Sequence, residues 1–207
     1  MAVYTKINKE ELEIFLLNYK LGELKAFTGI VEGIENTIYL ITTEKGKYIL
    51  TLYEKRVKKG DLPFFMNLLS SLSAQGFKCP SPIKDKQKKY INKIKDKNAS
   101  LVSYIEGKSK KKLTPFECKD VGKMCAKIHL LTKKVRGNQN QLSINYWKNI
   151  FNKTKSECDL IKKGLANDIS INLNFLEKNW PKNLPSGIIH ADIFPDNVLF
   201  NAGKVSG

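Results

Sequence analysis

Three polar residues near the end of the printed sequence have the types and spacing that phosphoryl transfer requires: His190, Asp192 and Asn197, within His-Ala-Asp-Ile-Phe-Pro-Asp-Asn. A carboxylate in this loop can orient an attacking hydroxyl and accept its proton. An amide oxygen five residues after it can coordinate the Mg²⁺ that neutralises the phosphates. We therefore predict Asp192 as the catalytic base and Asn197 as a metal ligand, with His190 holding the loop by hydrogen bonding.

Each of these residues also has an ordinary structural interpretation. Asp192 alone could be a turn residue and Asn197 could end a turn, but their joint spacing favours the catalytic interpretation. The same spacing occurs in the catalytic loop of protein kinases. Asp196 could cap the loop or approach the metal, and we favour capping. The other histidine, His129, lies near the end of a predicted helix, where packing or capping is favoured over catalysis.

The candidates for nucleotide binding lie earlier in the chain. Gly29 and Gly33 precede a predicted strand, and a flexible turn over them could cover phosphates through its backbone amides. Two glycines four residues apart are weak evidence by themselves. Ser103, Tyr104 and Ile105 end the last predicted strand before a linker, where an adenine-binding hinge between two lobes would lie.

The first half of the chain is predicted to alternate helices with β-hairpins. Asn8 and Glu11 form a capping box before an apolar helical stripe. The predicted elements are a helix from Lys9 to Tyr19, strands Thr37 to Thr43 and Lys47 to Tyr53, a helix between Asp61 and Gly76, and strands Lys89 to Ile94 and Ala99 to Ile105 around Asp96-Lys97-Asn98. This order indicates a small α+β lobe with a mostly antiparallel sheet over residues 1–105.

After a lysine-rich linker that begins at Glu106, the pattern becomes mainly helical. Thr114 and Glu117 form a second capping box. Predicted here are helices Thr114 to Leu131, Ile144 to Leu165 and Ser170 to Trp180, a short buried strand Gly187 to His190, and a strand Val198 to Phe200. A turn leads to a return strand that has only begun at Gly207, so we expect a C-terminal part of the protein to follow. Residues 106–207 are predicted as an incomplete catalytic lobe.

Length and composition indicate a packed globular protein. The chain has 207 residues, of which 42% are hydrophobic. No apolar run reaches the roughly 18 residues that span a bilayer, and no signal peptide is evident. The four cysteines form no C-x-x-C pair, so we expect buried thiols in a reducing compartment. We therefore expect a soluble cytoplasmic protein without a membrane partner.

The net charge of +16 raises the possibility of a nucleic-acid-binding protein. Of the 36 basic residues, however, only Arg56 and Arg136 are arginine, the side chain that dominates bidentate phosphate and base recognition. The lysine clusters, including Lys108 and Lys110 to Lys112, lie in turn-like stretches and are interpreted as solvated surface. We expect no nucleic-acid partner, although these lysines would help to attract a polyanion such as ATP.

Five segments together carry a resemblance to a known family: YILTLYEK, DLPFFMNLLSSLSAQGFKCPSPI, ASLVSYIEG, LTPFECKDVGKMCAKIHLLT and LPSGIIHADIFPDNVLF. They resemble the homoserine kinases built on the aminoglycoside phosphotransferase and choline kinase fold. This resemblance implies a two-lobed, protein-kinase-like α+β fold and phosphorylation of the L-homoserine hydroxyl by ATP with Mg²⁺, on the route to threonine. The alternative is a related kinase acting on choline, methylthioribose or an aminoglycoside.

Two departures from the wider superfamily pattern affect the site. Thr51 stands where other members carry a phosphate-contacting Lys or Arg on the third strand, and an apolar residue near Phe65 replaces its partner glutamate. The homoserine kinases share this TLYE-like pattern, so it does not imply an inactive enzyme, and Lys55 is the candidate cation. A second metal-binding Asp is expected after Gly207, so residues 1–207 alone are expected to lack kinase activity.

Overall fold

The computed structural model describes residues 3–31, 35–54, 60–137 and 142–207, which form two compact units. One unit comprises Met1–Val135 together with Ile188–Gly207, and the other comprises Arg136–Gly187. The predicted catalytic loop therefore belongs to the same compact unit as the predicted sheet. The lobe boundary near residue 105 stays a prediction.

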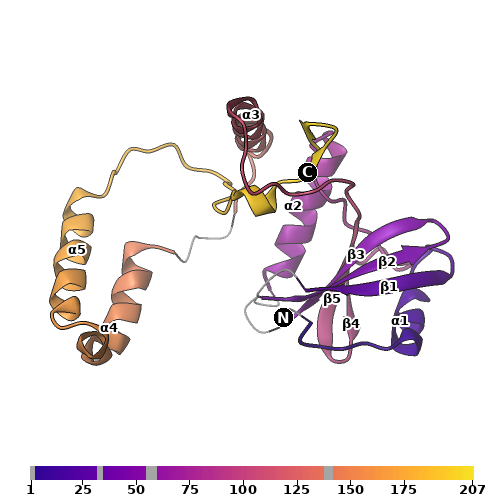
Figure 1. Ribbon diagram of the computed structural model, residues 1–207, viewed down its shortest axis with the longest axis horizontal. Coiled ribbons are helices and arrows are strands. Elements are labelled where there is room, and N and C mark those ends of the chain that lie inside the picture. Colours follow the sequence, from indigo (N-terminus) through magenta and orange to yellow (C-terminus); the bar gives the residue numbers. More distant parts are fainter. Residues whose placement is uncertain (1–2, 32–34, 55–59, 138–141) are drawn as a thin grey trace. The chain divides into compact units, whose positions relative to one another are not determined.

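The larger unit is built on an antiparallel sheet (Figure 1). Within the described residues this sheet has five strands in the order β1-β2-β3-β5-β4. The strands are β1 (Leu24–Ile30), β2 (Thr37–Thr43), β3 (Gly46–Tyr53), β4 (Ile91–Ile94) and β5 (Lys97–Ser103). Helix α1 (Lys9–Leu16) covers one face, and the leucines at the centre of this core are wholly buried.

Strand alternation gives the sheet a second face with a different exposure. Successive strand side chains point to opposite faces, so β2 alternates between buried and half-buried residues along its length. Register places Leu40, Ile49 and Val102 side by side on neighbouring strands, and all three are half-buried. The second face therefore presents a partly exposed apolar surface that extends onto β5, the last strand before the linker.

Both predicted capping boxes are confirmed. Asn8 Oδ1 accepts a hydrogen bond from Glu11 N at 2.8 Å, and Glu11 Oε2 accepts one from Asn8 N at 2.9 Å. Helix α1 ends at Leu16 rather than at Tyr19, and Asn18 Nδ2 bonds to Phe15 O at 3.0 Å just after its end. Such a side chain competes with the helical backbone for its carbonyl groups.

Strand β1 was not predicted from the sequence, and it corrects the interpretation of Gly29. Gly29 lies inside β1 opposite Tyr39, not in the turn that was predicted to start there. A Cβ at this position would lie 2.9 Å from Val3 Cγ2, so close packing of the N-terminal segment explains the glycine. Gly33 lies outside the described residues.

The second hairpin turns earlier than predicted. Lys95 and Asp96 are the turn residues, with φ of 46° and 60°. Two positive φ values are typical of the type I′ turn, whose twist matches the flanking strands. The predicted turn at Asp96-Lys97-Asn98 is therefore wrong, because Lys97 and Asn98 already pair with Ile94 and Lys93 in the ladder.

The larger unit has two further helices, one before β4 and one after the linker. Helix α2 (Leu62–Ala74) has Pro63 in its first turn, and Gly76 follows it with a φ of 72°. Asp61 occupies the N-cap position but makes no capping hydrogen bond with its side chain. Helix α3 (Pro115–Leu131) begins at the capping box of Thr114 and Glu117.

The smaller unit is a helical hairpin of α4 (Ile144–Ile161) and α5 (Leu165–Asn179). Its core consists of Phe151, Cys158 and Leu173 with a few half-buried neighbours. The predicted helices ran to Leu165 and started again at Ser170; instead Gly164, with a φ of 84°, separates α4 from α5. A left-handed backbone at glycine ends a helix without steric cost.

No helix in the described parts of the chain combines the length and apolar character needed to cross a membrane. The four cysteines all lie in described segments and are free thiols. Only Cys158 is buried, whereas Cys118 is exposed and the other two are half-buried, so the expectation of buried thiols is wrong for three of the four.

Candidate active site

The predicted catalytic loop ends in η1 (Pro195–Asn197), and the short strands β6 (Phe200–Asn201) and β7 (Lys204–Val205) follow as a hairpin. This hairpin confirms the predicted return strand. The predicted buried strand Gly187 to His190 is wrong, because the segment has no strand partner among the described residues and Ile189 is 57% exposed. We call residues 190–207, the loop with β6 and β7, the catalytic hairpin.

Asp192 and Asn197 are brought together as their spacing predicts. Asn197 Nδ2 donates to Asp192 Oδ2 and to Asp192 O, each at 2.9 Å. Both residues are exposed, so their polar atoms are accessible to a substrate. The arrangement leaves Asn197 Oδ1 without a hydrogen-bond partner among the described residues, and an amide oxygen is a suitable ligand for a hard cation.

The backbone of the loop is held in a tight conformation. Phe194 N donates to Asp192 O at 3.1 Å, and Asn197 N donates to Phe194 O at 2.9 Å. Ala191, just before the proposed base, has a φ of 64°, a left-handed conformation that is costly for a residue with a Cβ. Such strain is found at functional sites where the surrounding structure enforces it.

Apolar burial anchors the other end of the loop. Val198, Phe200 and Val205 form a buried cluster against Leu113 of the linker and against α3. Leu199 N also donates to Gly207 O at 2.8 Å, which extends the pairing of the hairpin. Asn197 therefore comes directly before a packed element, and its position follows that of β6.

In the part of the chain that the structure describes, His190 and Asp196 lack the contacts that fix Asp192 and Asn197. Both side chains are exposed, and neither makes a hydrogen bond or ion pair within the described residues. The loop is held by the contacts of Asp192, Phe194 and Asn197 given above. The roles predicted for His190 and Asp196 stay predictions.

The predicted hinge residues differ in what their backbone amides bind. Ser103 N donates to Ser81 O at 2.8 Å, and Tyr104 N donates to Lys47 O at 3.2 Å. Ile105 N has no hydrogen-bond partner among the residues that the structure describes. Ile105 is therefore the hinge candidate whose N–H is unpaired within the described residues.

Comparison with known proteins identifies the family. Residues 26–207 match the model of the phosphotransferase enzyme family. The chain belongs to this family. The match begins within β1 and includes the rest of the sheet, the linker and the whole catalytic hairpin.

Curated relatives of the chain include the homoserine kinases of Methylocella silvestris and Agrobacterium fabrum, each 42% identical over 208 aligned residues. All of this chain is covered, and it spans about 65% of the length of each relative.

Solved structures show the fold. A spectinomycin phosphotransferase in complex with ADP and spectinomycin has a TM-score of 0.70 at 17% identity, with 97% of this chain and 68% of that chain covered. An amicoumacin kinase in complex with AMP-PNP and Ca²⁺ has a TM-score of 0.67, also at 17% identity, over 97% and 62%. The α+β, kinase-like fold expected from the sequence is confirmed.

The oxygen donors of the loop would fit a magnesium site that substrate completes. No group of three or more His, Cys, Asp or Glu side chains in the described segments could hold a metal ion. Mg²⁺ is usually bound by one or two protein oxygens together with substrate phosphates, not by an all-protein cage. Asn197 Oδ1 is a hard oxygen donor of this kind. No cation is assigned to the phosphates. Thr51, which stands where other members carry a Lys or Arg, is an uncharged, half-buried residue of β3, and the candidate Lys55 lies outside the described residues.

The linker contains contacts that the sequence did not reveal. Gly107 approaches the catalytic hairpin so closely that a Cβ there would lie 2.6 Å from Ser206 Oγ. Lys108 exchanges two backbone hydrogen bonds of 3.0 Å with Phe200, and Lys110 pairs with Glu117. The side chains of Lys108 and Lys110 are nevertheless exposed, as the interpretation of this cluster as solvated surface expects. In the sequence, only Gly107 next to these lysines could have indicated that another segment packs closely against the linker.

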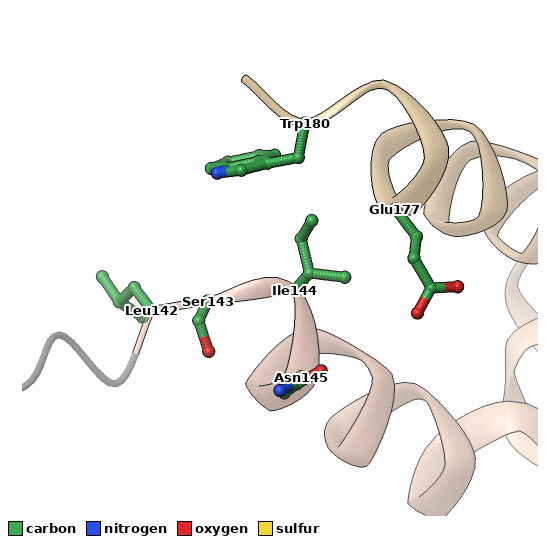
Figure 2. Close-up of a pocket in the computed structure, with 6 residues that line it drawn as sticks. All are labelled: Leu142, Ser143, Ile144, Asn145, Glu177 and Trp180. Carbon is green, nitrogen blue, oxygen red and sulfur yellow. The ribbon is translucent and has the colours of Figure 1, made fainter. Parts of the chain in front are cut away.

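The helical hairpin contains a separate pocket of about 430 Å³, lined by Leu142, Ser143, Ile144, Asn145, Glu177 and Trp180. Figure 2 shows Trp180 on the α5 side facing the start of α4. Two of its polar side chains have intramolecular partners: Glu177 pairs with Lys148 at 2.5 Å, and Ser143 Oγ accepts from Tyr146 N. None of the predicted site residues lines this pocket.

Proposed function

We propose that the protein is an ATP-dependent homoserine kinase that forms O-phospho-L-homoserine. The observation that carries this proposal is the hydrogen-bonded pair of Asp192 and Asn197 in a phosphotransferase chain that is 42% identical to curated homoserine kinases. The pair provides what transfer to an alcohol needs, a base and a metal ligand on one loop. The choice of homoserine as acceptor is supported by the relatives.

Asp192 is the base in this proposal. Its carboxylate is exposed, so an acceptor hydroxyl can reach it, and the bond from Asn197 restrains one of its oxygens. The restrained carboxylate orients the hydroxyl and accepts its proton as the hydroxyl oxygen bonds to the γ-phosphorus and the bond from that phosphorus to the leaving ADP breaks. His190 lies two residues earlier and is exposed, and the loop is held by the hydrogen bonds of Asp192, Phe194 and Asn197.

Asn197 binds the metal in this proposal. When bound, Mg²⁺ neutralises the charge that develops on the phosphates. Asn197 contributes Oδ1 as a ligand while its Nδ2 remains bonded to Asp192, so a single side chain couples the metal to the base. Its attachment to the buried part of the hairpin keeps this ligand in place without substrate.

The nucleotide is proposed to bind between the second face of the sheet and the hinge. Leu40, Ile49 and Val102 offer a half-buried apolar surface for a purine. Ile105 N can donate to the base, while Ser103 and Tyr104 hold the strand and its neighbours in register. Gly33 is proposed to contact the phosphates through its backbone amide, as the sequence predicts.

The two lobes are proposed as residues 1–105 for nucleotide binding and 106–207 for catalysis. ATP and L-homoserine are the small-molecule partners. Since the reaction consumes ATP and the chain carries free thiols, we place the enzyme in the cytoplasm.

The acceptor assay tests this function. Full-length protein with Mg-ATP is offered L-homoserine, choline, methylthioribose or kanamycin, and ADP release is measured. We expect homoserine to have by far the highest kcat/KM, the quantity that compares competing acceptors. A higher kcat/KM for any of the other three would replace homoserine with that acceptor, and no turnover with any of them would refute the proposal.

A further inference from the structure

One lysine of the linker contacts two elements of the catalytic region at once. Lys110 Nζ pairs with Glu117 Oε1 at the start of α3. The same ammonium lies 5.3 Å from the centroid of the Phe200 ring in β6, within the range of a cation–π interaction. Lys110 therefore joins the start of α3 to the strand that follows the catalytic loop.

Glu117 holds this lysine from a buried position. The residue is only 8% exposed, and its Oε2 accepts hydrogen bonds from Thr114 N at 2.9 Å and Thr114 Oγ1 at 3.1 Å. The hydrogen bond from Lys110, followed by that from the Thr114 backbone, lowers the pKa of Glu117. Since the capping box already serves the helix, the pairing with Lys110 is a second task for the same carboxylate.

Phe200 connects this ion pair to the site. It is buried, and it exchanges two backbone hydrogen bonds with Lys108. It comes three residues after Asn197, with the buried Val198 between them. Because so short a packed segment has little freedom, a shift of Phe200 moves Asn197 as well.

We propose that Lys110, held by Glu117, is a positioning residue: it fixes the linker on β6 and thereby sets the place of Asn197 Oδ1 for the metal–nucleotide complex. This inference rests on the proposed function for the role of Asn197. It extends that function by assigning a task to a lysine outside the loop.

The test uses full-length protein and four variants. Lys110→Met removes the charge and keeps an apolar chain, and Lys110→Arg keeps both the ion pair and the cation–π contact. Glu117→Gln keeps an acceptor for the capping box and removes the charge. Lys112→Met makes the same charge change at an exposed linker lysine that has no ion pair within the described residues, so it is the matched control.

Two measurements read the linker and the site separately. Hydrogen exchange followed by mass spectrometry reports the protection of peptides covering residues 106–113 and 198–207. Calorimetry of AMP-PNP binding at several Mg²⁺ concentrations reports how well the metal–nucleotide complex is held, without any acceptor. For Lys110→Met and Glu117→Gln we expect faster exchange and about threefold to tenfold weaker Mg²⁺-dependent binding, the size of a part-exposed ion pair with a cation–π contact. Lys110→Arg and Lys112→Met should behave as the wild type.

The outcomes separate this inference from the proposed function. Unchanged exchange in Lys110→Met would refute the link between the linker and β6. Faster exchange with unchanged Mg²⁺-dependent binding would leave a structural contact and refute the positioning role. If the wild type binds Mg-AMP-PNP but phosphorylates no homoserine, only the acceptor fails, and if it binds no nucleotide, both proposals fail.

Discussion

The sheet and the catalytic hairpin belong to one compact unit, yet they are held in different ways. In the sheet, Leu50, Leu52 and Leu101 are wholly buried in a core that α1 closes. In the catalytic hairpin, the residues proposed for chemistry are exposed and are held by hydrogen bonds. Burial there is confined to Val198, Phe200 and Val205.

This contrast shows that stability and chemistry rest on different side chains. A buried leucine contributes through the apolar surface that it removes from water, which affects folding only. An exposed carboxylate contributes little to folding, but a reaction can depend on it entirely. Substitutions in the two regions should therefore separate the free energy of unfolding from the rate of turnover.

The largest effect is expected at Asp192. Asp192→Asn in the full-length protein should lower kcat by about 10²- to 10⁴-fold, because the general base is lost. Its melting temperature and its affinity for ATP should hardly change, since the side chain is exposed and an amide oxygen can still accept from Asn197. Steady-state kinetics and thermal unfolding measure both quantities. Asp196→Asn, in the same loop, is the control and should keep its kcat; a near-normal kcat in Asp192→Asn would remove Asp192 from the role of base.

The second effect is expected in the sheet, where a substitution should lower stability and leave kcat unchanged. Leu50 is wholly buried, so Leu50→Ala should lower the free energy of unfolding by about 2–5 kcal/mol through lost burial and a cavity. Urea denaturation measures this, and kcat per folded molecule should be unchanged. Leu17→Ala, at a leucine that is 69% exposed, should change stability by less than about 0.5 kcal/mol. Equal losses at the two leucines would contradict the burial argument.

The smallest effect is expected where the linker meets the catalytic hairpin. A Cβ at Gly107 would lie 2.6 Å from Ser206 Oγ and 3.1 Å from Phe200 O, so Gly107→Ala should cost about 1–3 kcal/mol of stability through overpacking. Gly122 lies inside α3 with nothing within 4 Å of a Cβ, so Gly122→Ala should instead stabilise by about 0.5–1 kcal/mol. Thermal unfolding of both variants gives the two signs, and a stabilising Gly107→Ala would show that the linker does not pack against β6.

Local patterns were sufficient to predict several parts of the protein from its sequence. The capping boxes at Asn8 and Thr114 form because their partners lie three residues away on the same turn. The proximity of Asp192 and Asn197 follows from their spacing within a single short loop, although the hydrogen bond between them was not predicted. The β2–β3 hairpin was also predictable, since a turn and two alternating strands are contiguous in the chain.

Only the tertiary structure decided the features that depend on distant partners. Strand β1 exists because β2 offers it a ladder, whereas the apolar segment from Gly187 to His190 forms no strand because the described residues offer it no such neighbour. Gly29 is explained by Val3, and the clustered lysines of the linker separate into Lys110, which is bound to Glu117, and Lys112, which is not. The composition of a segment limits the contacts that it can make. Which of these contacts form is determined by hydrogen-bonded or packed partners far along the chain.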